Sequence, residues 1–368
     1  MADILVDKGQ PLIAPQHYLD KLIQARLELA QQTGPYLRWF GERYDDTVYQ
    51  PQRRKDWHNG HPTISRSLLT FDSGMACITG SPNRGKTTFI INMIVQGLLL
   101  NDDLIVLDFS FDDPMKDRVA QYTCALTGLE YHKVKLRVGL TEEERLLRVA
   151  AEQQIEQWVR EGRLRTVDSM EVLRSGERQA TIRMRKAQNI IQLMRQARAA
   201  HPDSRIAIFI DSWHNVDVTE AKSNNEISQA NYWLDQIHDE LNNLKLMLLA
   251  TLHLRKIPDC PPRIPTLDDI KGTSNLAYDA RWAYILVNEA VDEHYTDPMT
   301  YLYRREEVPI VVLHRLKNKV SDWNGKLIMP LLENSCGLSS LTTEQYMYYE
   351  AILKTKDRDT VYKKEKRK

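Results

Sequence analysis

The chain has 368 residues, and its 50 basic and 50 acidic side chains give a formal net charge of zero at pH 7. This balance excludes a strong overall attraction to nucleic acid or to an anionic membrane, so any such contact must be local. The four cysteines, Cys77, Cys124, Cys260 and Cys336, are far apart and form no C-x-x-C pair, which predicts a reducing compartment and no structural zinc.

The first 15 residues lack a basic region followed by an apolar core, and no apolar run approaches the roughly 18 residues of a membrane span. We therefore expect a cytoplasmic protein without a membrane partner.

Residues 1–67 are predicted to form a small helical segment followed by a linker. Five apolar residues recur at three- and four-residue steps, namely Leu19, Leu22, Ile23, Leu27 and Ala30. One such stripe cannot bury itself, so it should pack on the main domain or on another subunit. Residues 51–62 contain prolines, a glycine and charged side chains, which indicates an irregular linker.

From residue 68 to about 340, short apolar runs alternate with longer helical patterns. Strands are predicted at 75–80, 103–111, 206–211, 244–254, 282–287 and 309–316. Amphipathic helices are predicted between them, for example over 184–194 and 227–241. This alternation predicts an α/β fold with a mostly parallel, twisted sheet and helices on both faces. Residues 341–368 are expected to form a basic, solvated C-terminal tail.

A phosphate-binding loop is predicted in ITGSPNRGKTTF, residues 78–89. Gly80, Gly85, Lys86 and Thr87 have the spacing G-x-x-x-x-G-K-[ST], with a predicted strand before them and a helix after them. Lys86 is expected to neutralise the β and γ phosphates of ATP, and Thr87 to bind Mg²⁺. The alternative is a glycine turn without a ligand. The predicted nucleotide-binding residues are Gly80, Ser81, Pro82, Asn83, Arg84, Gly85, Lys86, Thr87, Thr88 and Asp211.

Three carboxylates at the ends of predicted strands are candidates for binding Mg²⁺ or activating water. Asp211 ends the run IAIFID, where a carboxylate can bind Mg²⁺, although an ordinary turn aspartate is the alternative. Asp112 and Asp113 follow the strand predicted over 103–111. Because ligands in open α/β sheets gather at the carboxyl ends of strands, one of these two is expected to activate water.

Taken in order, these motifs resemble the ATPase domain of ring-shaped replicative helicases of the DnaB type, particularly the Twinkle and phage helicase-primase branch, within the RecA-like P-loop fold. FSFDDP, residues 109–114, resembles the strand and catalytic glutamate of that family, which falls on Asp112. IFIDSW, residues 208–213, resembles its Walker B strand. TLHLRK, residues 251–256, is similar to its sensor strand, which places the γ-phosphate sensor on His253.

Two further segments extend the resemblance to about residue 340. Residues 269–273 match the family's D-[LI]-[RK]-G-[ST] turn, and residues 314–327 are similar to its K-x-R strand and glycine turn. That strand reaches the ATP site of the next subunit, so the resemblance assigns Lys317 and Lys319 to a neighbour's site. Lys319 stands where an arginine finger is expected and lacks the planar donor of arginine. Asp112 is one methylene shorter than the family's glutamate.

The resemblance implies an ATP-driven helicase or translocase on single-stranded DNA, acting as a hexameric ring in a bacterial or phage-infected cell, with a primase or loader as partner. It places DNA contacts in two loops, 213–226 and 255–269. The predicted DNA-binding residues are Arg255, Lys256, Arg263, Lys222 and Lys271. The alternative for these loops is scattered surface charge. The basic pattern of Arg183, Arg185, Lys186, Arg195 and Arg198 is predicted to be the solvated face of a helix.

A second function also fits the motifs. A RecA-like regulatory or loader ATPase would bind nucleotide and partner proteins without unwinding DNA, and DNA-stimulated turnover distinguishes it from a helicase.

Overall fold

The computed structural model describes residues 6–7, 10–11, 20, 24, 74–82, 84–175, 178–218, 225–255, 265–271, 275–288, 308–319, 326–332, 337–338, 344–345 and 347–354. The predicted N-terminal helix lies outside the described residues apart from Asp20 and Gln24, which are helical. The predicted linker lies wholly outside them, as do Asn83, Lys222, Lys256 and Arg263. Two short strands, β1 (Val6–Asp7) and β2 (Gln10–Pro11), pair in antiparallel fashion.

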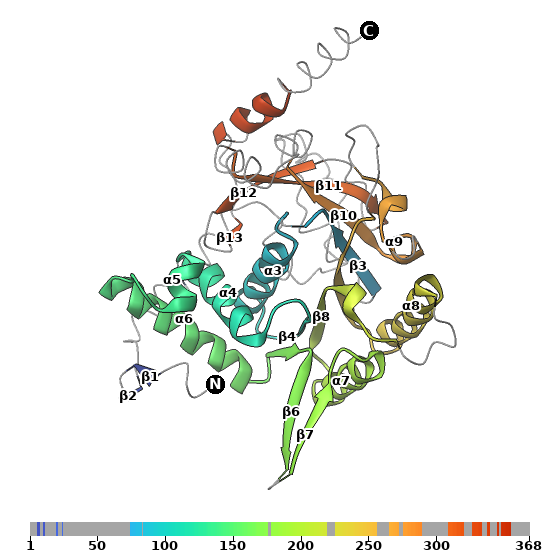
Figure 1. The fold of residues 1–368 in the computed structure, drawn as a ribbon, viewed down its shortest axis with the longest axis horizontal. Helices are drawn as coiled ribbons and strands as arrows, with labels where there is room; N and C mark the ends of the chain where they lie inside the picture. Colours follow the sequence, from blue (N-terminus) through green and yellow to red (C-terminus); the bar gives the residue numbers. More distant parts are fainter. Residues whose placement is uncertain are drawn as a thin grey trace.

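The described core is built on a nine-stranded sheet in the order β13-β12-β11-β10-β3-β9-β8-β4-β5 (Figure 1). Six strands pair in parallel: β3 (Gly74–Thr79), β4 (Leu104–Ser110), β5 (Leu164–Asp168), β8 (Arg205–Asp211), β9 (Met247–Leu252) and β10 (Trp282–Val287). Three more continue the sheet in antiparallel fashion beyond β10: β11 (Ile310–Asn318), β12 (Lys326–Leu332) and β13 (Gly337–Leu338). The predicted α/β fold with a mostly parallel sheet is confirmed.

The six predicted strands are all present because their apolar runs are buried on both faces of the sheet. Every residue of β3, β4, β9 and β10 is buried. Strand β5 was not predicted. It lies at the edge of the sheet and buries only Leu164 and Val167, which polar or charged residues separate, so it has no continuous apolar run.

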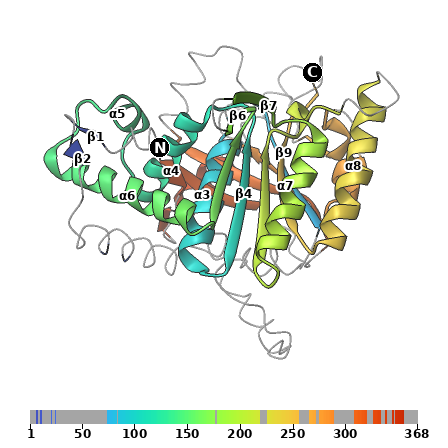
Figure 2. The ribbon, with the colours of Figure 1, turned by 90° about the horizontal axis from the view of Figure 1, so that it is seen from below.

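Helices cover both faces of the sheet (Figure 2). On one face, α3 (Lys86–Leu100), α4 (Met115–Thr127) and α6 (Glu142–Arg160) bury apolar side chains, and the short α5 (Tyr131–Leu136) packs on α4. On the other face lie α7 (Ala187–Ala200), α8 (Glu226–Asn243) and α9 (Asn275–Asp279). Successive residues of β3 point to opposite faces of the sheet, so Met75 lies in the core on one face and Ala76 in the core on the other.

Local side-chain contacts define several helix ends. Helix α6 begins with a capping box, in which the Thr141 hydroxyl accepts from the Glu144 N–H and the Glu144 carboxylate accepts from the Thr141 N–H. The Asn225 side chain caps α8 by accepting from the Ile227 N–H. Helix α4 ends at Gly128, which has the left-handed conformation that favours glycine.

The segment before α7 corrects the predicted helix over 184–194. Residues 170–183 form a hairpin of β6 (Met170–Ser175) and β7 (Arg178–Arg183), which extends away from the sheet in Figure 1. Helix α7 begins only at Ala187, so Met184 precedes it. The predicted basic helix face is therefore wrong for Arg183, which lies on β7, and for Arg185 and Lys186, which precede α7. Arg195 and Arg198 do lie on α7.

Among the described helices, none has the length and hydropathy that a membrane crossing requires. Within the same residues, no group of three or more His, Cys, Asp or Glu side chains is arranged to hold a metal ion. Cys77 and Cys124 are buried free thiols.

Candidate nucleotide-binding site

Two glycines shape the loop between β3 and α3. A Cβ atom on Gly80 would lie 2.6 Å from the carbonyl oxygen of Leu286 on the neighbouring β10. The loop backbone can therefore approach β10 this closely only at a glycine. Gly85 has a left-handed φ of 79° and is the N-cap of α3. The loop therefore opens on the N-terminus of α3, where free backbone N–H groups attract an anion.

The Lys86 side chain folds back over this loop. Its Nζ donates to the carbonyl oxygens of Gly80 and Ser81, at 2.9 Å each. Burial lowers the pKa of Lys86, while the nearby carboxylates of Asp211 and Asp112 act in the opposite direction. The ammonium group is thus held at the predicted phosphate loop, where it interacts with the carboxylates of Asp211 and Asp112.

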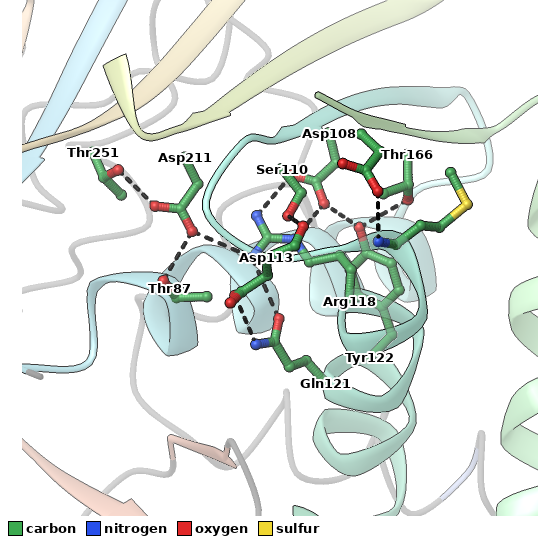
Figure 3. A network of polar contacts seen from close by, with 12 residues as sticks. Thr87, Asp108, Ser110, Asp113, Arg118, Gln121, Tyr122, Thr166, Asp211 and Thr251 are labelled. Atoms are coloured by element: carbon green, nitrogen blue, oxygen red, sulfur yellow. Dashed lines mark hydrogen bonds and ion pairs between the residues drawn. The ribbon is translucent and has the colours of Figure 1, made fainter. Parts of the chain in front are cut away.

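The structure brings together the two predicted magnesium ligands, Thr87 and Asp211. The Thr87 hydroxyl donates to Oδ2 of Asp211 at 2.8 Å, and the Thr251 hydroxyl donates to Oδ1 at 2.7 Å (Figure 3). Thr87 lies in the first turn of α3, and Asp211 is the last residue of β8. Hydroxyl and carboxylate oxygens are ligands that Mg²⁺ accepts, so these residues fit the predicted ion. Thr251, on β9, was not predicted.

The other predicted loop residues have different surroundings. Ser81 is partly buried, Pro82 is exposed and Arg84 is buried. Thr88 follows Thr87 in α3, and its carbonyl oxygen accepts from Asn92 at 2.7 Å.

Asp112 and Asp113 are adjacent in sequence but make different contacts. Oδ1 of Asp112 accepts a hydrogen bond from Asn215. Burial raises the pKa of Asp112 and repulsion from Asp211 adds to this, whereas His253 opposes it. Asp113 instead accepts from the Gln121 side chain at 3.0 Å, and its carbonyl oxygen accepts from Ser110 at 2.8 Å. Asp112 interacts with the predicted magnesium ligand Asp211 and with His253, whereas Asp113 is held by Gln121 and Ser110, so the position of Asp112 suits a base better.

Replacing Asp112 with Asn should leave ATP binding intact and slow hydrolysis by roughly a hundredfold or more, the contribution of general base catalysis. Phosphate release and equilibrium nucleotide binding measure the two effects separately. Asp113→Asn is the matched control, and it should retain most turnover. A large loss in Asp113→Asn with normal turnover in Asp112→Asn would assign the base to Asp113.

Two histidines lie side by side at the same edge of the sheet. His253 follows β9, and its ring centroid is 5.0 Å from that of His214, which follows β8. Burial lowers the pKa of both rings, and lowers that of His214 to about 4. The positive charge of Lys86 also lowers the pKa of His253, so the predicted sensor lies close to the phosphate loop. His214 was not predicted; its only sequence signal is its place three residues after Asp211, the last residue of β8.

Lys317 lies near the end of β11, an inner strand of the sheet, and Lys319 lies just beyond it. Lys317 pairs with Ala283 of β10, which pairs with Cys77, so Lys317 is level with the middle of β3. Burial and then repulsion from Lys319 lower the pKa of Lys317 to about 8. The Lys319 N–H donates to the Arg281 carbonyl oxygen at 2.8 Å, and the Arg281 N–H donates to that of Met75 at 2.7 Å. Lys319 is therefore level with the start of β3, whereas the phosphate loop follows the end of β3. The chain does not bring these lysines to its own phosphate loop.

Of the predicted DNA-binding residues, only Arg255 and Lys271 are described. An isolated bridge between Leu254 and Ile270 closes the base of the 255–269 loop, and the Lys271 N–H donates to the His253 carbonyl oxygen at 2.9 Å. The side chain of Arg255 donates to the Ile270 carbonyl oxygen at 3.0 Å. The loop therefore begins and ends beside the predicted γ-phosphate sensor.

The phosphate loop follows β3, and the carboxylate of Asp211 ends β8. An additional strand, β9, lies between β3 and β8 in the sheet. This arrangement defines a P-loop nucleotide-binding protein with a RecA-like core. The family model described as DnaB-like helicase C terminal domain matches residues 66–318. The chain belongs to this family, as the resemblance predicted.

Solved structures show the same fold at low sequence identity. One of them, an ATPase domain, is 15% identical with a TM-score of 0.58, and the match covers 82% of this chain and 100% of that one. A DnaB-like replicative helicase, described with its interactions with primase, is 17% identical with a TM-score of 0.56. This second match covers 73% of the present chain and 57% of the helicase. No curated protein matches the sequence.

Proposed function

We propose that the chain is the motor of a DnaB-like replicative helicase, which hydrolyses ATP with Mg²⁺ to move along single-stranded DNA. The observation that carries the proposal is the cluster of Lys86, Thr87, Asp211 and Asp112 around one phosphate loop. Family membership supports the same activity.

Each side chain has a role that follows from its position. The loop N–H groups and Lys86 bind the phosphates of ATP, and the oxygens of Thr87 and Asp211 bind Mg²⁺. When bound, Mg²⁺ offsets the negative charge that develops on the transferring phosphate. Asp112 orients and deprotonates the attacking water, and His253 detects the γ-phosphate from the end of β9.

In this proposal the active site is shared between subunits. Lys317 and Lys319 are level with the middle and the start of β3, whereas the chain's own phosphate loop follows the end of β3, so they would serve the loop of a neighbour. A homo-oligomeric ring, hexameric by family, satisfies this geometry. Residues 68–340 would form the motor domain, residues 1–67 would contribute to subunit packing, and residues 341–368 would form a tail. A primase or a loader is the expected partner.

The DNA would pass the two loops that start beside the nucleotide site. His253 and Lys271 lie at the base of the 255–269 loop. This position supports a coupling between the nucleotide bound at the site and the affinity of the loop for DNA. Basic side chains there would contact phosphates without reading bases.

Adding single-stranded oligonucleotide to the purified chain tests the proposal, because a motor should hydrolyse ATP faster when DNA is present. Turnover that stays the same with and without DNA would favour the regulatory or loader ATPase. The comparisons with known proteins give no support to that alternative.

Replacing Lys256 and Arg263 with alanine should weaken binding to all single-stranded sequences about equally. Each lost phosphate contact should reduce the slope of log affinity against log salt by about 0.7. Fluorescence anisotropy over a salt series measures both quantities. Arg195→Ala is the matched control, since Arg195 lies on α7 and pairs with Glu240. An effect on one base composition only, or an equal loss in the control, would contradict the role of the loop.

A further inference from the structure

A buried arginine, Arg118, lies behind the proposed magnesium site. Its side chain is fully buried in α4, and it binds Asp108 of β4 through two hydrogen bonds, Nε to Oδ2 at 2.7 Å and Nη2 to Oδ1 at 3.0 Å. The fully buried Tyr122 hydroxyl also donates to Asp108. This two-pronged pairing fixes the plane of the guanidinium group.

The remaining edge of the guanidinium group points at Asp211. Nη1 of Arg118 donates to Oδ2 of Asp211 at 3.3 Å, the same oxygen that accepts from Thr87 (Figure 3). Thr251 holds the other oxygen. Three donors from three different elements, α3, β9 and α4, therefore fix the orientation of this carboxylate. Arg118 also offsets the charge of two buried carboxylates, which lie on the neighbouring strands β4 and β8.

The same guanidinium group is connected to the turn that carries the proposed base. Nη1 lies 3.4 Å from Oε1 of Gln121, whose amide donates to Asp113 at 3.0 Å. The Ser110 hydroxyl closes this turn by donating to the Asp113 carbonyl oxygen. Asp112 lies within the closed turn. The chain of contacts therefore runs from the magnesium carboxylate through α4 to the residues that flank the base.

We propose that Arg118 is a positioning residue, which holds Asp211 in the orientation that binds Mg²⁺ and, through Gln121, fixes the turn of Asp112 relative to it. Arg118 touches neither of the proposed reacting groups of ATP and water, so it acts through the two carboxylates. The inference rests on the proposed function, since it assigns a support to the same site.

The affinity for a fluorescent ADP analogue, measured with Mg²⁺ and with EDTA, tests the proposal without requiring turnover. The ratio of these two affinities reports how strongly the metal ion couples to the nucleotide. Arg118→Gln should reduce this ratio about tenfold or more, and should lower kcat by a similar factor, as loss of a group that orients a metal ligand does. Its affinity in EDTA should stay within about twofold of wild type, because the phosphate loop itself is unchanged.

Arg148→Gln is the matched control. Arg148 is also a buried arginine paired with a carboxylate, Glu152 at 2.9 Å, but both lie on α6 and contact none of the site residues. This variant should melt at a lower temperature and keep the wild-type affinity ratio. An equal fall in both variants would show a general effect of destabilisation and would overturn the proposal.

Gln121→Ala tests the positioning role of Arg118 if Arg118→Gln does not fold. It removes the link to Asp113 without leaving a buried charge. It should lower kcat about tenfold or more, the effect of one hydrogen bond to a charged group, with no change in the affinity ratio. Wild-type kcat in this variant, or wild-type coupling in a folded Arg118→Gln, would overturn the proposal. A wild-type chain whose ADP affinity does not respond to Mg²⁺ would overturn the proposed function together with it.

Discussion

Lys86→Ala is expected to abolish ATP turnover. The Lys86 ammonium lies against the carbonyl oxygens of Gly80 and Ser81, and alanine leaves nothing to offset the charge of the β and γ phosphates. Hydrogen bonds to charged groups contribute about 1.5–3 kcal/mol each, so ATP affinity should also fall by about tenfold to a hundredfold. Phosphate release and equilibrium binding of a fluorescent ATP analogue measure the two losses.

Lys135→Ala serves as the control for this substitution. Lys135 is an exposed lysine that pairs with Asp117, and exposed ion pairs contribute little to stability. The control should hydrolyse ATP at the wild-type rate. Normal turnover in Lys86→Ala would remove the nucleotide site on which every other assignment depends.

Lys319→Ala is expected to retain ATP binding and to lose most turnover. Trans arginine fingers of related nucleotide hydrolases contribute roughly 10³ to 10⁵ in rate, and a lysine supplies the point charge without the planar donor. Because Lys319 is level with the start of β3, its removal should not alter the chain's own phosphate loop. The ATP affinity of this variant should therefore stay near the wild-type value while its rate of hydrolysis falls.

Mixing the two inactive variants tests whether the site is shared. A mixed ring places an intact loop from Lys319→Ala beside an intact Lys319 from Lys86→Ala, so some activity should return. The mixture must be assayed under conditions in which subunits exchange. If activity never returns, and Lys319→Ala alone hydrolyses ATP normally, the site is complete within one chain.

The sequence predicted six of the nine strands of the sheet because burial on both faces requires continuous apolar runs. Strands β12 and β13, at one end of the sheet, were not predicted. Strand β5 and the hairpin of β6 and β7 lack such runs. Arg183 ends the hairpin but lies close in sequence to the basic residues Arg185 and Lys186, and it was therefore predicted to share a helix with them. Only the pairing of Met170 with Arg183 and of Ser175 with Arg178 shows two strands.

The candidate site was predictable where one rule of the fold applies. Carboxyl ends of parallel strands meet at one edge, so Asp211 could be expected near Thr87 although 124 positions separate them. Thr251 and Arg118 follow no such rule. Thr251 is a single hydroxyl within an apolar strand, and Arg118 is one of many arginines on amphipathic helices. Their proposed roles follow only from the folded structure, in which β9 pairs with β8 and the Arg118 side chain reaches Asp211 from α4.

Unwinding of a forked DNA duplex with ATP and Mg²⁺ tests the central claim most directly. The wild-type chain should release the labelled strand, and Lys86→Ala should not release it under the same conditions. Wild-type protein that hydrolyses ATP, binds single-stranded DNA and still releases no strand, with the expected primase or loader present, would contradict the helicase assignment.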